Sequence, residues 1–267
     1  MKTIGSILFI MMSIILMCSC EKEKEKEIAQ GEGKEKEIAQ GNVKTTSYFD
    51  YDDFITEGLV AYYPFNGNAN DSSGNGLDGI ANNLSYSSDR FDQPERACHF
   101  NGINSYIKID NSELLNGNKY TICFWYSEDL TDPLQQSIIS KSDTARLGFT
   151  LGMSKRDYSS QLYFAIKYKP GIELLTILGL TKWNGGGERK FEFAAVAFSE
   201  TEYIDYFGGG KASYNSLVFN SNKYDLYIGK SENGRYKNFK GEIDDLLIYN
   251  RILTHEEIEK LYKWNKK

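Results

Sequence analysis

The sequence contains few of the residues that build most metal and catalytic sites. Its 267 residues include 2 histidines, 4 cysteines and 4 prolines. With His99 and His255 as its only histidines, it cannot form a histidine-rich zinc site. It also has no G-x-S-x-G segment for the nucleophile turn of a serine hydrolase. The formal charge is −6, and the only basic run is balanced by glutamates, which argues against nucleic-acid binding.

Aromatic and β-branched residues are plentiful and occur in short runs. The chain has 19 tyrosines and 15 phenylalanines, and its strand-like runs are "YIKI", "YTICFWY", "LGFTLG", "LYFAIKY", "ELLTILGL", "FEFAAVAF", "DLYIGK" and "EIDDLLIY". Turn residues separate these runs, and no helical pattern alternates with them. For residues 58–267 this predicts a single all-β domain, a sandwich of two facing sheets with about six strands each. Trp125, inside "CFWY", is predicted to lie in the core.

One helix is predicted at the C-terminal end. In "THEEIEKLYKW", Thr254 is placed as an N-cap, and Glu257 three residues later completes a capping box. Ile258, Leu261 and Tyr262 form an apolar stripe along one face. We expect this short helix to close one side of the sandwich.

Residues 1–19 have the pattern of a secretory signal peptide. Lys2 precedes an apolar run from Ile4 to Met17, which is shorter than the roughly 20 residues that span a bilayer. The run ends in "MCSC", which resembles a bacterial lipobox and implies a lipid on Cys20, although Met17 stands where leucine is usual. The alternative is an ordinary signal peptide that is cut nearby.

Residues 20–57 are predicted to be a solvated tether. "KEKEIAQG" occurs twice at a period of ten, and three glycines interrupt the segment, which disfavours a stable helix. "CEKEKEKE" resembles the charged start of surface-exported lipoproteins in Bacteroides-like bacteria. This resemblance implies an outer-membrane lipoprotein that is exposed on the cell surface and contacts the membrane through Cys20.

The segment "GLVAYYPFNGNANDSSGNGLDG", residues 58–79, begins as a strand and continues as a polar loop. Asp71, Ser73, Asn75 and Gly76 form a D-x-S-x-N-G series, the spacing with which a calcium loop presents alternate oxygen ligands. An EF-hand is excluded, because its twelfth position would be Asn82. The alternative is a loop without calcium, whose acids accept hydrogen bonds from backbone amides.

Several motifs resemble one family of lectin-like domains. They are the polar loop, "CHFNGINSYIKI", "YTICFWY", "DLYIGK" and the closing "FKGEIDDLLIYNRILTHEEIEKLY". Together they look like the laminin-G-like, pentraxin-related jelly rolls of the concanavalin A-like lectin/glucanase superfamily, over nearly all of residues 58–264. The middle departs from the pattern, because "FEFAAVAFSETEYIDYFGGGK" lacks the Trp-His that often opens the corresponding strand. The resemblance implies a jelly-roll sandwich.

The resemblance also implies a structural calcium ion between the polar loop and an Asp on the last strand. Asp244 matches that position, so the expected metal residues are Asp71, Asn75 and Asp244. Simple alternation places Asp244 on the face of Leu246 and Ile248, where a cation would stabilise its carboxylate. The same alternation turns Asp245 toward solvent or a loop, as the second choice of ligand.

No catalytic activity is expected. Glycoside hydrolases of this superfamily carry E-I-D-x-x-E on one strand, and retaining hydrolysis needs two carboxyls about 5 to 5.5 Å apart. Glu242 and Asp244 match the first two acids, but Leu246 or Leu247 stands in the place of the proton donor. A leucine cannot transfer a proton.

The function expected from the sequence is carbohydrate binding. The partner would be a glycan or a host or cell-surface glycoprotein, bound through loop aromatics. The candidates are Trp183, Tyr206 and Tyr214, each of which could instead be a structural aromatic. A protein-binding adhesin is the alternative function.

Cys98 and Cys123 form either a disulfide or two buried thiols.

Overall fold

The protein is described by a computed structural model that covers residues 55–128, 135–142, 148–156, 159–169, 172–181, 191–199, 202–205, 211–213, 224–232 and 234–264. Its elements are β1 (Leu59–Tyr63), β2 (Ile80–Asn82), β3 (Ser85–Ser87), β4 (Ala97–Asn101), β5 (Tyr106–Ile109), η1 (Glu113–Leu115), β6 (Lys119–Glu128), β7 (Gln136–Ser142), β8 (Gly148–Arg156), β9 (Ser159–Lys169), β10 (Ile172–Thr181), β11 (Glu192–Ser199), β12 (Glu202–Asp205), β13 (Lys211–Ser213), β14 (Leu226–Ile228), β15 (Lys237–Asn238), β16 (Lys240–Tyr249) and α2 (His255–Lys263). Within these residues, no helix is long and apolar enough to cross a membrane.

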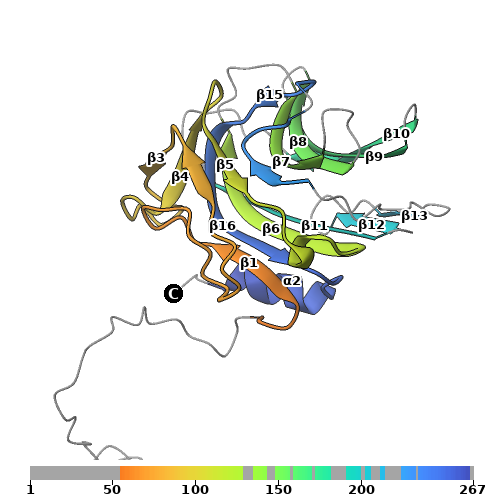
Figure 1. Ribbon diagram of the computed structural model, residues 1–267, viewed down its shortest axis with the longest axis horizontal. Helices are drawn as coiled ribbons and strands as arrows, with labels where there is room; N and C mark the ends of the chain where they lie inside the picture. Colours follow the sequence, from red (N-terminus) through yellow and green to blue (C-terminus); the bar gives the residue numbers. More distant parts are fainter. Residues whose placement is uncertain are drawn as a thin grey trace, which may run out of the picture. The chain divides into compact units, whose positions relative to one another are not determined.

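Two sheets face each other, as Figure 1 shows. The first sheet has the order β13-β12-β11-β6-β16-β4-β3, with β1 also paired to β16. The second has the order β10-β9-β8-β7-β14-β5-β2, with β15 paired to β7. This confirms the all-β sandwich with a C-terminal helix. Among the described residues each sheet has eight strands. The count exceeds the predicted six because β2, β3, β13 and β15 have only two or three residues, too few to leave an alternating pattern.

Alternation along the strands separates the core from the surface. In β5, Ile107 and Ile109 are buried, while Tyr106 and Lys108 point to the other face. At one end of the core, the ring centroid of Phe198 lies 4.9 Å from that of Phe149 and 4.6 Å from that of Phe164. Aromatic residues from both sheets therefore interlock between the layers.

β16 changes neighbours halfway along its length. Its residues 240–243 pair with β4, and its second half pairs with β1 on the same side. Between Asp244 and Leu247 the register with β6 shifts, and Asp245 has a positive φ of 47°. This β-bulge moves the alternation by one residue. Ile243, Leu246 and Ile248 therefore all face the core.

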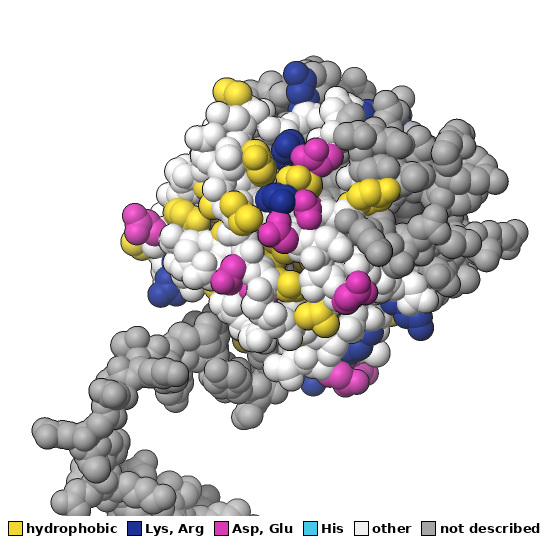
Figure 2. Space-filling model, in the orientation of Figure 1, with side chains coloured by type: hydrophobic (Ala, Val, Ile, Leu, Met, Phe, Trp, Pro, Cys, Tyr) yellow, Lys and Arg dark blue, Asp and Glu magenta, His cyan; other side chains and the backbone are white. Residues whose placement is uncertain are grey.

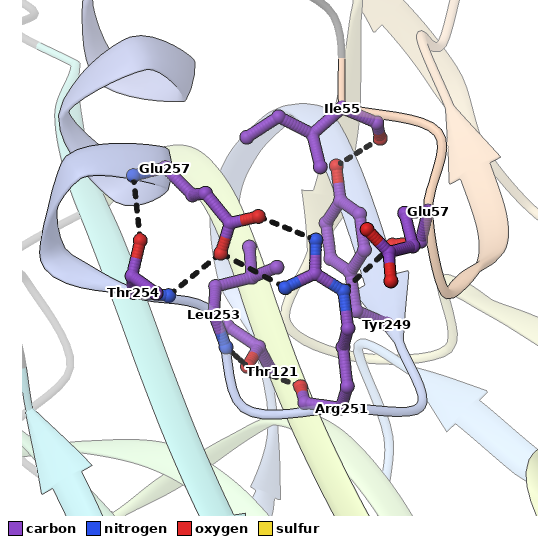
Figure 3. A network of polar contacts seen from close by, with 8 residues as sticks. All are labelled: Ile55, Glu57, Thr121, Tyr249, Arg251, Leu253, Thr254 and Glu257. Atoms are coloured by element: carbon purple, nitrogen blue, oxygen red, sulfur yellow. Dashed lines mark hydrogen bonds and ion pairs between the residues drawn. The ribbon is translucent and has the colours of Figure 1, made fainter.

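The start of α2 is tied to the first described residues, as Figure 3 shows. Thr254 and Glu257 form the predicted capping box. The Arg251 guanidinium donates two hydrogen bonds, of 2.8 and 2.6 Å, to the Glu257 carboxylate, and its Nε donates to the carbonyl of Glu57 at 2.8 Å. The Tyr249 hydroxyl donates to the carbonyl of Ile55 at 3.0 Å. These bonds join the beginning and the end of the domain.

The helix α2 lies against the outer face of the first sheet, next to β1 (Figure 1). The ring of Tyr262 stacks on that of Trp125, with centroids 5.5 Å apart, and Phe193 lies 5.1 Å from Trp125. The prediction that Trp125 is a core residue is wrong, because its strand turns Phe124 and Tyr126 inward. Trp125 instead lies half-buried beneath the helix.

Candidate functional site

The bulge of β16 holds two buried carboxylates on the outer face of the first sheet. Asp244 is 3% exposed and Asp245 is 5% exposed. The prediction that Asp244 shares a face with Leu246 and Ile248 is wrong, because the extra residue of the bulge reverses the alternation. Asp245 does not point to solvent, since its Oδ1 accepts a 2.6 Å hydrogen bond from the hydroxyl of Tyr62.

Arg90 is the counter-ion of both acids. One of its terminal nitrogens donates to Asp244 Oδ2, and the other donates to Asp245 Oδ2 at 2.8 Å. The Arg90 side chain is only 7% exposed, and its guanidinium lies over the rings of Phe91 and Trp125, at 4.6 and 4.8 Å from the centroids. A planar, delocalised cation can bridge two carboxylates and stack on aromatic rings at the same time.

The loop between β3 and β4 is shaped so that Arg90 points inward. The Asp89 carboxylate accepts hydrogen bonds from the backbone N–H groups of Phe91, at 2.8 Å, and Gln93, at 2.9 Å. Such side-chain turns are what short acidic residues favour in loops. We did not predict Arg90 as a site residue. The available signal was the pair "DD" in a largely buried strand, which implies a cation somewhere else in the chain.

Burial controls the protonation of this cluster. Desolvation, followed by the charge of Asp245, raises the pKa of Asp244 to about 8, although Arg90 opposes the shift. Desolvation and Asp245 also raise the pKa of Tyr62 well above its usual value. The neighbouring carboxylates raise the pKa of Arg90 against the effect of its own burial, so it stays charged. We conclude that one cation serves two acids, and that Asp244 holds a proton more easily than an ordinary aspartate.

The polar loop covers the open edge of β1. The Asp71 carboxylate accepts four hydrogen bonds, from the N–H groups of Tyr62, Ser73 and Leu77 at 2.9 to 3.0 Å and from the hydroxyl of Ser73 at 2.8 Å. Asn75 Nδ2 donates to the carbonyls of Leu59 and Val60, at 3.1 and 2.9 Å. Edge groups of β1 that would otherwise need water or another strand are thereby satisfied.

The three residues expected to bind calcium therefore already have protein partners. Four donors occupy the oxygens of Asp71, the amide group of Asn75 binds the edge of β1, and Asp244 pairs with Arg90. In the described part of the chain, no group of three or more His, Cys, Asp or Glu side chains is arranged to hold a metal ion. Asp71 fits calcium only if the ion replaces some of these donors. The calcium site stays a prediction.

Glu242 and Asp244, the two acids compared with a hydrolase motif, lie on the outer face of the first sheet. His99 Nδ1 is 3.3 Å from Glu242 Oε1, and the two residues are cross-strand partners in β4 and β16. Leu246 and Leu247 are buried, at 0% and 2% exposure.

Cys98 and Cys123 are buried free thiols, which is the second of the two predicted alternatives, and burial raises the pKa of both.

The second sheet carries an aromatic and charged patch on its outer face. Tyr106 and Tyr227 project from β5 and β14, with ring centroids 6.0 Å apart. Lys230 Nζ lies 4.6 Å from the Tyr106 centroid and 5.2 Å from that of Tyr227, and it is 3.0 Å from Glu232 Oε1. We call these four residues the tyrosine patch. Burial, followed by hydrogen bonding to Glu232, raises the pKa of Tyr227 to about 12, so its hydroxyl stays protonated at neutral pH.

More charges surround the tyrosine patch. Lys108, which pairs with Tyr227 across the strands, lies 2.7 Å from Asp110 and 3.0 Å from Asp225. The face drawn in Figure 2 likewise carries basic, acidic and hydrophobic side chains close together near its middle. The sequence contained a signal for this surface, because the buried isoleucines of "YIKI" and "DLYIGK" turn Tyr106, Lys108 and Tyr227 outward.

Four predicted site residues lie outside the described residues. They are Trp183, Tyr206 and Tyr214, predicted to bind ligand, and Cys20, predicted to carry the lipid.

Comparison with known proteins identifies the family and the fold. Residues 101–259 match the Concanavalin A-like lectin/glucanases superfamily. Among curated proteins, no sequence matches the chain significantly. Among solved structures, domain 4 of AbnA, a GH43 extracellular arabinanase from Geobacillus stearothermophilus in complex with arabinotriose, is 18% identical with a TM-score of 0.57. That match covers 76% of this chain and 97% of that one.

Binding domains of botulinum neurotoxins are also similar. One, from serotype DC in complex with rat synaptotagmin II, is 13% identical with a TM-score of 0.59, over 79% of this chain and 52% of that one. Another, from type C, is described as needing two ganglioside molecules for cell entry. It is 14% identical with a TM-score of 0.57, over 78% of this chain and 51% of that one. The chain thus spans about half of these neurotoxin chains. At such identities the likeness shows the fold alone.

Proposed function

Because the chain belongs to the Concanavalin A-like lectin/glucanases superfamily, we propose that it is a lectin-like module that binds a glycan without cutting it. The observation that carries this proposal is the tyrosine patch, in which two rings and a lysine meet on one outward sheet face. Tyrosine rings pack against the apolar C–H faces of sugars. The amine of Lys230 and the carboxylate of Glu232 would bond sugar hydroxyls.

The relatives in fold support the same class of ligand. The arabinanase domain was solved with arabinotriose, and the type C neurotoxin is described with gangliosides. Both ligands contain sugars, although the two domains share little sequence with this chain. Trp183, Tyr206 and Tyr214 stay in the proposal as a second set of candidate contacts.

A glycan array followed by calorimetric titration of the purified protein tests the proposal. We expect Tyr106→Ala with Tyr227→Ala to weaken binding of the best glycan about fivefold or more, if each lost sugar–ring contact removes about 0.5 to 1.5 kcal/mol, as aromatic contacts do. Leu114→Ala, at an exposed hydrophobic residue outside the patch, is the matched control and should bind normally. Normal glycan binding by the double variant would show that the binding site lies outside the tyrosine patch.

A protein-binding adhesin is the second candidate. A similar neurotoxin binding domain, of which this chain spans about half, was solved in complex with rat synaptotagmin II, which supports a protein as the partner. Specificity would then depend on a broad surface and not on stacked rings. Binding to matrix proteins but to no glycan on the array would favour this candidate.

The absence of catalysis is part of the proposal. It is supported by Leu246 and Leu247, which stand in the place of the acid, and by the pairing of Asp244 with Arg90. We expect no release of reducing sugar from β-glucans, galactans or host glycans. Release that disappears in Glu242→Gln would instead identify a hydrolase.

We also propose that the module is held at the outer membrane by a lipid on Cys20, at the end of the charged tether. Cys20→Ala should then move the protein from the membrane fraction to the soluble fraction.

A structural calcium ion in the polar loop is the cofactor that we propose. It would bind at Asp71 in exchange for protein donors.

A further inference from the structure

A lysine lies on the core-facing side of the second sheet. Lys141 is the next-to-last residue of β7 and is 1% exposed. Its neighbour Ser140 is opposite the outward Tyr227, whereas Lys141 itself is opposite Phe149, a core residue of β8. Lysine is among the residues least often buried completely.

The amine of Lys141 contacts a carboxamide. Its Nζ donates a 3.0 Å hydrogen bond to Asn111 Oδ1 and another to the carbonyl of Tyr224. Asn111 is fixed in turn, because its backbone N–H donates to Asp225 Oδ1 at 2.9 Å. Burial lowers the pKa of Lys141 to about 8, although the charge of Asp225 opposes the shift. A substantial fraction of the amine is therefore neutral near physiological pH, which is the nucleophilic form.

We propose that Lys141 and Asn111 are joined by an intramolecular isopeptide bond. The lone pair of Lys141 Nζ attacks Asn111 Cγ and forms a new C–N bond. The bond between Cγ and Nδ2 breaks, and Nδ2 leaves as ammonia, taking the proton that the lysine amine gives up. One amide replaces another, so no oxidant, reductant or cofactor takes part.

The geometry favours this reaction over attack by a dissolved amine. The carbon that is attacked is one C=O bond, about 1.23 Å, from the oxygen that Lys141 already contacts. Because both groups belong to one folded chain and are already in contact, the step is intramolecular and needs no collision with a dissolved amine. Ammonia escapes into dilute solution, which makes the reverse reaction negligible.

The bond would cross-link two strands that are not neighbours. Asn111 follows β5 and Lys141 is near the end of β7, while β14 lies between these strands in the sheet. The covalent bridge would link β5 to β7 and pass the carbonyl of Tyr224, two residues before β14. It would also remove a charge from a buried site. This inference does not depend on glycan binding.

Peptide mass spectrometry tests the bond directly. The purified full-length protein is held for several days at mildly alkaline pH, then unfolded and digested with trypsin. We expect a branched peptide that joins the segments of residues 111 and 141 and is lighter, by one ammonia, than the sum of its parts. Trypsin should also fail to cleave after Lys141, because an acylated lysine carries no charge.

Variants separate this pair from its neighbours. Lys141→Arg keeps a charge but has no amine nucleophile, and Asn111→Ala has no carboxamide, so both should lack the branched peptide. Lys108→Arg, at the more exposed lysine that pairs with Asp225, is the matched control and should retain it. Recovery from wild type of a peptide cleaved after Lys141, together with an Asn111 peptide of unmodified mass, would overturn the proposal. This outcome is read from wild type, so it holds even if a variant fails to fold.

Discussion

Two acidic sites beside β1 contain the same kind of side chain but have opposite kinds of partner. Asp71 is half-buried, and neutral N–H and O–H groups occupy its oxygens. Asp244 and Asp245 are buried, and both pair with the same cation, Arg90. Tyr62 joins the sites, because its N–H donates to Asp71 and its hydroxyl donates to Asp245.

The difference follows from burial. A partly exposed carboxylate keeps some contact with water, so hydrogen-bond donors alone can hold it. A carboxylate pair taken out of water needs a countercharge, and even with Arg90 one of the two acids gains a proton more readily. We therefore expect the Arg90 cluster to carry a large, pH-dependent part of the stability, and the Asp71 loop to carry a smaller part.

Removal of Arg90 is expected to have the largest effect. Arg90→Ala removes the cation that pairs with both buried acids, and breaking a buried ion pair in this way costs about 3 to 5 kcal/mol. Urea denaturation measures the loss in the free energy of unfolding. Arg96→Ala, at an exposed arginine of the same loop, is the control and should change it little. Equal values for the two variants would contradict a special role for Arg90.

The pH dependence of stability is the next largest effect. Because the pKa of Asp244 is about 8 in the folded state and about 3.8 when the chain is unfolded, the folded state holds more protons between these values. Stability should therefore fall as the pH rises from 4 to 8, by at most about 1.4 kcal/mol per pH unit. Asp244→Asn cannot ionise and should lose this decline. The test compares the melting temperatures of Asp244→Asn and wild type from pH 5 to 8. If the two melting temperatures change with pH in parallel, the prediction is wrong.

Truncation of Asp71 is expected to have a moderate effect. Asp71→Ala leaves the N–H groups of Tyr62 and Leu77 without their acceptor, and an unsatisfied group that is partly buried costs about 1 to 3 kcal/mol. Asp71→Asn keeps one oxygen acceptor, so its stability should lie between those of Asp71→Ala and wild type. Glu113→Ala, at an exposed acid, is the control for lost charge. Chemical denaturation at pH 7 measures the free energy of unfolding of all three variants. If Asp71→Ala is as stable as wild type, the loop does not have the edge-covering role.

The fold could be predicted from the sequence because its long strands satisfy two requirements at once. "YTICFWY" and "EIDDLLIY" contain β-branched and aromatic residues that favour strands, and turn residues bound each of them. The C-terminal helix carries its own start signal in Thr254 and Glu257, so its cap was predicted correctly. These are local patterns, and they need no knowledge of distant contacts.

The site could not be predicted to the same degree, because its geometry depends on contacts between distant residues. The bulge at Asp245 leaves no pattern in "EIDDLL", yet it decides which face Asp244 occupies. Arg90 lies 154 residues before Asp244. The spacing of Asp71, Ser73 and Asn75 fits both an Asx-turn loop and a calcium loop, since both need oxygen atoms at alternate positions.

Of the four predicted effects on stability, that of calcium should be the smallest. It also tests most directly how the Asp71 loop differs from the Arg90 cluster. An ion that binds only the folded state raises the melting temperature by mass action, but here it has to replace donors that already hold Asp71. We therefore expect weak binding and a stabilisation of about 1 kcal/mol at a calcium concentration several times the Kd. Magnesium should do less, since it keeps its waters and needs a smaller octahedral shell. Differential scanning calorimetry of protein first stripped with a chelator measures the shift. Asp71→Ala should lose the calcium increment, and Glu113→Ala should keep it. An increment that survives in Asp71→Ala would place the ion outside this loop. A wild type that melts identically with and without calcium would leave the loop with one role, the hydrogen-bonded cover of β1.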